Sequence, residues 1–436
     1  MKKILLFAIT LLMTNVLGLS AQDTKIEKSY TKEIDKLAKN KQIEAAFATI
    51  VALEPLSQSD LILLTEIEAP PFKEEKRAAQ YKKMLLEAGA DEAWIDEVGN
   101  VLALKKGIKG DRTVALDAHL DTVFPEGTDV KVKYKGDTMY APGIGDDTRG
   151  LVVVLTTLRA LTKNQIQTEA DLLFVGSVGE EGLGDLRGVR HLFENGNINI
   201  DSWISIDGGS IGRVNNKGLG SKRYKAIFKG PGGHSWGAFG LANPHHAIGK
   251  AIDYFTAEAT KYTDSGARTS FNVGRMGGGT SVNSIPFESW MEVDMRSVSP
   301  DRLNEIDGIF KAAMDRALND YNATVKKGPK LTLELVQIGD RPSGELETSL
   351  ALVQRSMAAT KFFGEEPQLT RGSTNSNIPI SKGIPAVTLG RGGIGSSAHS
   401  LHEWWMNKNG ADAIKLALLI TVAEAGLDDS RSVRNK

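Results

Sequence analysis

Cysteine is absent from this 436-residue chain. Its absence excludes disulfide bonds, a cysteine nucleophile, thiolate metal ligands and the lipid-modified cysteine of a lipoprotein. Any metal site must therefore be built from histidine, aspartate and glutamate. Surplus charge is also lacking, because the formal net charge is only −1. Nothing in this balance favours a nucleic acid or a membrane surface as a partner.

Long hydrophobic runs are absent beyond the N-terminus. There, two lysines precede a mostly apolar stretch at residues 4–17, and small residues follow it. This pattern predicts a bacterial export signal at residues 1–21, cleaved before Gln22. An uncleaved anchor is the alternative, although the stretch is short for a span and carries polar residues. The expected location is periplasmic or secreted, with no membrane attachment after cleavage.

The length of the chain favours two domains. Residues 26–214 and 338–428 share a pattern of apolar strands and helices with acids at the strand ends, which is typical of an open α/β sheet. Between them, residues 215–337 follow a β-α-β-β-α-β order, with a helix at 300–321 that begins with Pro300 behind Ser299 as a cap. We expect this stretch to be an inserted α+β unit of its own.

At the N-terminal end of the first part, the sequence predicts three helices. The first covers Ser29 to Leu53 on an amphipathic pattern, and the second begins at Ser57 as an N-cap. The third runs from about Lys73 to Ala88, with Gly89 as its C-cap.

His119 and Asp121 end a buried strand and lie two residues apart, so they are expected to face one site. A carboxylate beside an imidazole fixes the tautomer that a metal needs. A core histidine beside a surface aspartate would explain this pair equally well. Further acids and histidines, however, also sit at strand or helix ends, most of them beside glycine: Asp146, Asp147, Glu180, Glu181, Asp207, His399 and His402. Five such clusters favour an oxygen-and-imidazole metal site, which suits zinc, cobalt or manganese.

These motifs, in this order, resemble those of a known family. They are His119-Leu-Asp121-Thr-Val, Gly145-Asp146-Asp147, Glu180-Glu181-Gly, Asp207-Gly-Gly, Gly233-His234-Ser235 and His399-Ser-Leu-His-Glu403-Trp. The family comprises the zinc exopeptidases that include peptidase T, carboxypeptidase G, the dipeptidases and the aminoacylases. The resemblance implies an α/β fold, with a three-layer catalytic domain and an inserted α+β ferredoxin-like lid or dimerisation domain. Thr148 departs from the lysine that many members carry after the acidic pair.

The resemblance also implies a role for each residue and two Zn²⁺ per chain, with Co²⁺ or Mn²⁺ as alternatives. Asp146 would bridge the two metals, and its peptide bond to Asp147 would be cis. The remaining ligands would be His119 and Asp207 on one metal, and Glu181 and His399 on the other. Glu180 would be the general base for a water held between the metals, with Asp121 orienting His119. His402 could compete with His399, but the spacing to Glu403 favours His399.

Three further residues are candidates on weaker grounds. His234 would stabilise the oxyanion in a partner subunit's active site, which implies a homodimer through the inserted unit, although several relatives are monomers. Arg371 could bind a substrate carboxylate, and a surface arginine is the alternative. Asn283 could contact substrate, or it could serve only its turn.

The sequence therefore predicts an exported di-zinc exopeptidase that hydrolyses small peptides. An N-acyl-amino-acid amidohydrolase is the second reading, because these motifs do not separate peptidases from acylases. The third is a non-catalytic peptide-binding relative, which the presence of Glu180 disfavours.

Overall fold

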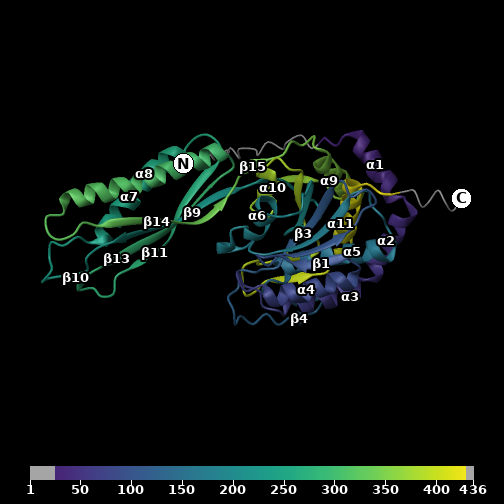
Figure 1. Ribbon diagram of the computed structural model, residues 1–436, viewed down its shortest axis with the longest axis horizontal. Coiled ribbons are helices and arrows are strands. Elements are labelled where there is room, and N and C mark those ends of the chain that lie inside the picture. Colours follow the sequence, from purple (N-terminus) through teal and green to yellow (C-terminus); the bar gives the residue numbers. More distant parts are fainter. Residues whose placement is uncertain (1–24, 429–436) are drawn as a thin grey trace, which may run out of the picture.

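The computed structural model describes residues 25–428. The predicted export signal lies outside these residues. Within them, no single helix is long and apolar enough to cross a membrane, and one bent pair, Lys41–Ala52 with Glu54–Thr65, meets the criteria by length and composition only. Figure 1 shows a larger unit and a smaller, elongated unit that projects from it.

The larger unit is built on a nine-stranded mixed sheet. The strand order is β1-β2-β6-β3-β7-β17-β8-β15, and β16 pairs with β8. The bounds are β1 (Glu92–Ile95), β2 (Val101–Lys105), β3 (Thr113–His119), β6 (Asp171–Ser177), β7 (Ser202–Ile206), β8 (Arg213–Gly218), β15 (Gly344–Glu345), β16 (Gln368–Gly372) and β17 (Ala386–Leu389). Its four central strands, β6, β3, β7 and β17, are parallel neighbours. Their carboxyl ends therefore meet at one edge, where ligands bind in such sheets.

Helices cover both faces of this sheet (Figure 1). Strand β3 shows why, since Val114 and Leu116 belong to one hydrophobic cluster and Ala115 to another on the opposite face. The first cluster includes residues of α1 (Lys28–Ala38), α2 (Lys41–Ala52), α3 (Glu54–Thr65), α4 (Glu75–Ala88), α5 (Gly150–Lys163), α9 (Ala351–Phe362) and α11 (Gly410–Ala425). The second includes residues of α6 (Arg187–Glu194) and α10 (Asn377–Ser381). This is the three-layer α/β arrangement that the sequence predicts.

A small antiparallel sheet joins two distant parts of the chain beside the large sheet. Its order is β18 (Ile394–Ser396), β19 (Trp404–Met406), β5 (Thr138–Tyr140) and β4 (Lys133–Lys135). Pairing of β19 with β5 brings the segment that contains His399 next to the turn that contains Asp146.

The smaller unit has its own sheet and its own core. Its elements follow the order β9 (Gly220–Lys229), α7 (Pro244–Thr263), β11 (Thr269–Gly278), β13 (Glu288–Ser297), α8 (Pro300–Thr324) and β14 (Thr332–Arg341). The strands are arranged β11-β13-β9-β14, and both helices contribute to the hydrophobic cluster on one face. The predicted β-α-β-β-α-β pattern is present, and Ser299 caps α8. At the far end from the larger unit, β10 (Gly233–His234) pairs with β12 (Ser284–Ile285) (Figure 1).

The structure divides the chain at slightly different points from the sequence. Residue 215 falls within β8, which pairs with β17 of the large sheet, and the smaller sheet spans residues 220–341. Strand β8 contains two asparagines, which are uncommon in buried strands, so its composition did not predict a strand of the large sheet. The single helix expected from Ser29 to Leu53 is two helices, because Asn40 interrupts it and caps α2.

Two end signals of the N-terminal helices had different outcomes. Ser57 is not an N-cap but lies buried inside α3, where its hydroxyl bonds Thr156. Gly89 does terminate α4, with the positive φ of 102° that favours glycine.

Candidate active site

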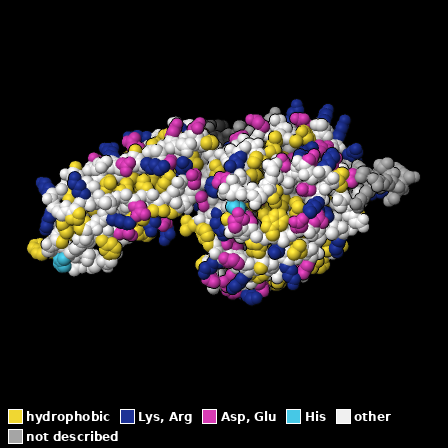
Figure 2. All heavy atoms as spheres, in the orientation of Figure 1, with side chains coloured by type: hydrophobic (Ala, Val, Ile, Leu, Met, Phe, Trp, Pro, Cys, Tyr) yellow, Lys and Arg dark blue, Asp and Glu magenta, His cyan; other side chains and the backbone are white. Residues whose placement is uncertain are grey.

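The predicted site residues come from segments that follow the parallel strands. His119 ends β3, Glu180 and Glu181 follow β6, and Asp207 follows β7. Asp146 lies on the helical turn before α5, and His399 lies between β18 and β19. These segments border a cleft of about 390 Å³ whose other wall is the smaller unit. Figure 2 shows the hollow between the two units.

Asp146 lies between the two histidines of the site. Its Oδ1 atom is 3.4 Å from His119 Nε2, and its Oδ2 atom is 3.1 Å from His399 Nε2. Burial raises the pKa of Asp146, but the two imidazoles outweigh it and hold that pKa well below its ordinary value. The Asp146–Asp147 peptide bond is cis, as the resemblance implies. Each oxygen of one carboxylate therefore faces a different imidazole, the arrangement that a bridging ligand requires.

The donor atoms fall into overlapping groups of the kind that hold metal ions. His119, Asp146 and Asp207 form one group, and Asp146, Glu181 and His399 form a second, with each group's atoms within 4.8 Å of one another. His119, Glu180 and Glu181 form a third. Imidazole and carboxylate donors in sets of three suit zinc and similar divalent cations. The first two groups share only Asp146, so the residues fit a pair of cations.

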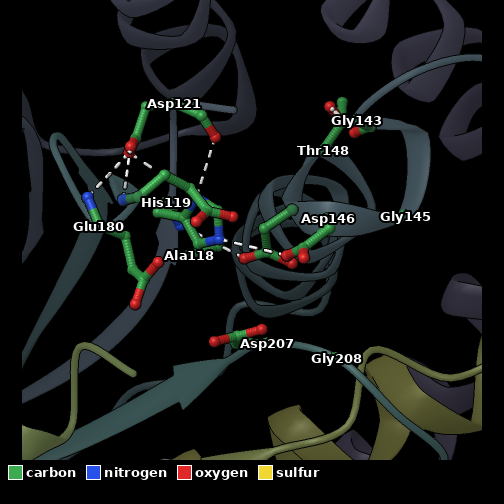
Figure 3. A network of polar contacts seen from close by, with 12 residues as sticks. Ala118, His119, Asp121, Gly143, Gly145, Asp146, Thr148, Glu180, Asp207 and Gly208 are labelled. Atoms are coloured by element: carbon green, nitrogen blue, oxygen red, sulfur yellow. Dashed lines mark hydrogen bonds and ion pairs between the residues drawn. The ribbon is translucent and has the colours of Figure 1, made fainter. Parts of the chain in front are cut away.

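Asp121 holds both sides of the site through backbone groups. Its carboxylate accepts hydrogen bonds from the backbone N–H of Glu180 at 3.0 Å and of Glu181 at 2.8 Å. Its own carbonyl oxygen is 2.9 Å from His119 Nδ1, closer than its carboxylate at 3.7 Å. Figure 3 shows Asp121 on the opposite side of His119 from Asp146. Asp121 thus orients His119, mainly through its carbonyl, and also fixes the segment of the two glutamates.

Glu403 performs a similar task for the turn that carries Asp146. Its buried carboxylate accepts hydrogen bonds from the backbone N–H groups of Gly143 at 2.7 Å, Gly145 at 3.0 Å and Asp146 at 2.9 Å. A Cβ on Gly145 would lie 2.8 Å from Glu403 Oε1, so this close approach requires glycine. Burial, together with the nearby charge of Asp146, raises the pKa of Glu403 to about 7.

Glu180 is buried against Arg341, a residue that the sequence analysis missed. Arg341 ends β14, and its Nη1 donates to Glu180 Oε1 at 3.0 Å while Nη2 donates to the Glu180 carbonyl. Burial raises the pKa of Glu180 well above its ordinary value, against the opposing effect of Arg341. A carboxylate with a raised pKa is a better proton acceptor near neutral pH.

The two histidines have raised pKa values in the absence of metal. Burial lowers the pKa of His119, but Asp121 and Asp146 outweigh it and raise that pKa well above the ordinary value. Hydrogen bonds to Asp146 and Glu181 raise the pKa of His399 to about 10. The His399 imidazole is therefore protonated at neutral pH, and a cation that binds either histidine competes with a proton.

Asp147 is not part of any of the three donor groups. It is fully buried, and its Oδ2 atom accepts from the backbone N–H of His119 at 3.3 Å. Burial raises its pKa well above the ordinary value. Asp147 thus supports the end of β3 behind the site.

Arg371 is not brought into the cleft. Its guanidinium donates to the carbonyls of Gly218, Val298 and Gly344 and to the carboxylate of Glu345. This geometry gives it a role at the junction of the two units and does not support the expected substrate contact. The four arginines that do line the cleft were not among the candidates: Arg213, Arg223, Arg296 and Arg341. They lie on regular strands whose sequence gives no sign of which end faces a ligand.

His234 and Asn283 lie together at the tip of the smaller unit. The Asn283 carbonyl accepts from the backbone N–H of Ser235 at 2.9 Å, and the Asn283 side chain accepts from Ser281 at 2.6 Å. The tip is remote from the donor groups of the same chain (Figure 1). His402 is exposed and belongs to none of the donor groups.

The fold and the site define a metal-dependent hydrolase. The model of Peptidase family M20/M25/M40 matches residues 115–421. This match spans well over half of the chain, which therefore belongs to that family.

Two relatives align with about two thirds of the chain. The uncharacterised protein YqjE of Bacillus subtilis is 25% identical over 305 residues, which are 67% of this chain and 76% of YqjE. Carboxypeptidase G2 of a Pseudomonas species is 25% identical over 305 residues, 68% of this chain and 70% of the enzyme.

Solved structures share the fold at lower identity. Aminopeptidase PepT of Bacillus cereus has a TM-score of 0.66 at 20% identity, covering 85% of this chain and 98% of its own. The di-peptidase Dug1p of Saccharomyces cerevisiae has a TM-score of 0.68 at 17% identity, covering 88% of this chain and 98% of its own. A dinuclear metal-binding peptidase of Bacillus subtilis, the YXEP protein, has a TM-score of 0.61 at 17% identity, covering 86% of this chain and 99% of its own.

Proposed function

We propose that this protein is an exported di-zinc exopeptidase that hydrolyses small peptides. The observation that carries the proposal is the position of Asp146, whose two oxygens face His119 and His399 while Glu180 lies beside the same cleft. Export rests on the signal pattern of residues 1–21.

The two cations would be held by the donor groups that share Asp146. His119 and Asp207 would complete one site, and Glu181 and His399 the other. Zinc is the default for hydrolysis without sulfur ligands, with Co²⁺ or Mn²⁺ as alternatives. When bound, such cations polarise a carbonyl and lower the pKa of water.

Glu180 would take the proton of the attacking water and pass it to the leaving amine. Its carboxylate is positioned for this by the Asp121 contact to its backbone N–H and by Arg341 on its side chain. Its raised pKa favours proton uptake near neutral pH. Because Arg341 contacts one oxygen, the other stays free for the reacting water.

The arginines of the cleft favour a substrate with a free carboxylate. Arg296 is held by Asp294 through its Nε atom at 2.8 Å, and no hydrogen bond from its terminal amino groups is made to the described residues. A guanidinium presented in this way can bind a carboxylate with two hydrogen bonds. This supports a small peptide bound through its C-terminal carboxylate, with Arg296 in the role that the sequence suggested for Arg371.

An N-acyl amino acid carries the same carboxylate and the same kind of amide bond. It remains the second candidate substrate, since no feature of the cleft distinguishes the two. A peptide-binding relative without activity would have no need of the buried contacts that position Glu180.

His234 would complete the site of a partner subunit. Its Nδ1 atom accepts from the backbone N–H groups of Trp236 and Gly237, both at 3.3 Å. The ring proton therefore lies on Nε2, which can donate to an oxyanion. The exposed edge strand β11 offers backbone groups for pairing across a two-fold axis.

A substrate panel tests this proposal. The purified zinc-loaded protein would be incubated with dialanine, trialanine, trialanine amidated at its C-terminus and N-acetylalanine. We expect cleavage of the free peptides and little cleavage of the amidated one. Preferential cleavage of N-acetylalanine would establish the second candidate, and no cleavage of any amide would contradict the proposal.

A further inference from the structure

Asp117 is a buried charge that the mechanism above does not use. It lies in the middle of β3, two residues before His119 and on the same face of the strand. Its carboxylate accepts hydrogen bonds from Ser177 Oγ at 2.7 Å, Ser205 Oγ at 2.8 Å and Asn375 Nδ2 at 2.8 Å. Buried carboxylates persist only where several donors compensate them. Here the donors come from β6, β7 and a segment far along the chain.

Asn375 belongs to a short loop, residues 373–376, which together with Asn377, the first residue of α10, is tied to three parts of the molecule. Asn375 Nδ2 reaches Asp117 and also Ser177 Oγ at 2.7 Å. Thr374 bonds Thr388 of β17 at 2.8 Å. Asn377 Nδ2 donates to the carbonyls of Leu219 at 2.9 Å and Pro342 at 3.0 Å.

Leu219 and Pro342 are the two points where the chain crosses between the units, because they separate β8 from β9 and β14 from β15. A loop attached only there would move with the smaller unit. The contacts of Asn375 and Thr374 attach it instead to the central strands, which are buried on both faces.

The same loop forms part of the cleft. Ser373 and Thr374 line it, and Ser373 Oγ accepts from Arg341 Nη1 at 3.1 Å. That nitrogen also donates to Glu180. The loop therefore lies between the buried carboxylate of Asp117 and the guanidinium of Arg341, which contacts the proposed base Glu180.

We infer that Asp117 and Asn375 are a positioning pair that fixes the loop 373–376, and through it Ser373 and Arg341, for substrate binding. The pair acts by matching an acceptor on β3 with an amide donor on the loop. Neither residue touches substrate. The kinetic part of this inference rests on the proposed peptidase function, whereas the structural part does not.

The test reverses the pair one residue at a time. Asn375→Asp places two carboxylates at hydrogen-bond distance, so the loop should detach from β3. We expect KM for trialanine to rise at least tenfold, kcat to fall by about tenfold because Arg341 also positions Glu180, and the zinc content to be unchanged. Hydrogen exchange should accelerate in residues 371–380 and not in β6. The double variant Asp117→Asn with Asn375→Asp again places one donor opposite one acceptor. It should restore most of the activity on trialanine and most of the protection of residues 371–380 from hydrogen exchange.

Glu424→Gln is the matched control, because Glu424 is a buried carboxylate bonded to Ser202 and Arg355 away from the cleft. It should lower the melting temperature without changing KM. If Asn375→Asp does not fold, Asn375→Ala gives the same comparison with a smaller perturbation. A lowered melting temperature with unchanged KM and unchanged exchange in the loop would overturn the inference, and so would loss of zinc. If no substrate is cleaved, the exchange data decide it alone.

Discussion

Two regions of the molecule differ in how they surround a histidine. The first is the floor of the cleft, where His119 and the other donor groups lie, and the second is the tip of the smaller unit, where His234 lies. On the floor, His119 is buried, and its ring lies between Asp121 and Asp146. At the tip, the ring of His234 accepts hydrogen bonds from backbone groups of its own turn, beside Trp236 and Phe239, which are 87% and 82% exposed. Large contiguous patches of exposed apolar side chains are typical of interaction surfaces.

On the proposed function, this difference separates what one chain would do alone from what would need a second chain. The floor has the donor groups, Glu180 and the buried carboxylates of Asp121 and Glu403 within one chain. Under the same proposal, the tip would supply His234 Nε2 as a hydrogen-bond donor. On the proposed function, the floor should bind metal in a monomer, whereas turnover should need the tip of a second chain.

The largest effect is expected on the floor, from Glu180→Gln. The glutamine keeps the contact to Arg341 but cannot accept a proton, so kcat should fall by about 10²–10⁴ with the metal content unchanged. Steady-state kinetics and metal analysis would be measured together. Asp185→Asn is the control, since it removes a carboxylate 3.9 Å from the same arginine. Turnover within tenfold of wild type in Glu180→Gln would place the base elsewhere.

A smaller loss is expected at the tip. His234→Ala should reduce kcat by about 10²–10³, because one oxyanion donor is removed. His246→Ala, on the same unit, should have little effect. Mixing Glu180→Gln with His234→Ala chains should then restore activity toward about a quarter of wild type, since hybrid dimers contain one intact site. Confirmed subunit exchange without recovered activity would argue against the action in trans.

Loss of the Glu403 contacts to the turn that carries Asp146 should lower the affinity for metal. Glu403→Gln leaves one backbone N–H of the Asp146 turn without an acceptor, so zinc should bind about 10–100-fold more weakly. Competition with a fluorescent chelator would measure this. Glu424→Gln, remote from the site, should leave the affinity unchanged. Equal affinity in both variants would mean that the turn holds its shape without Glu403.

The smallest expected effect is the release of protons when metal binds. The pKa of His399 is raised to about 10, so its imidazole is protonated at neutral pH before metal binds, and hydrogen bonds to Asp121 and Asp146 also raise the pKa of His119 despite its burial. Metal binding should therefore release at least the His399 proton and should weaken as pH falls. Calorimetry in buffers of different protonation enthalpy measures the release, and His399→Ala should release one proton fewer. An affinity that does not depend on pH would contradict this charge assignment.

Much of the floor could be predicted from the sequence, since its residues follow apolar strands directly. Parallel strands bring their carboxyl ends together, so His119, Glu180 and Asp207 had to be neighbours once the sheet was recognised. The cis bond followed from the resemblance, whereas the inserted unit followed from the β-α-β-β-α-β pattern of residues 215–337. The family and the fold class are confirmed by the comparisons.

The contacts between the units could not be predicted in this way. Arg341 and Arg371 are both arginines at strand ends, and only the path of the chain at the junction decides which one faces the cleft. Arg371 was a candidate for binding a substrate carboxylate because a polar loop follows it. Its guanidinium instead donates hydrogen bonds to Glu345 and to three backbone carbonyls. The buried acids Asp117 and Glu403 gain their partners from distant segments, which spacing along the chain does not reveal.

The most direct test of the account is the metal content of three variants beside wild type. Two zinc ions per chain are expected in wild type after loading and dialysis. Asp207→Asn and Glu181→Gln should each lose one ion, whereas Asp146→Ala should lose both, because only Asp146 belongs to both donor groups. Two ions retained in Asp146→Ala, or only one bound in wild type, would contradict the paired site.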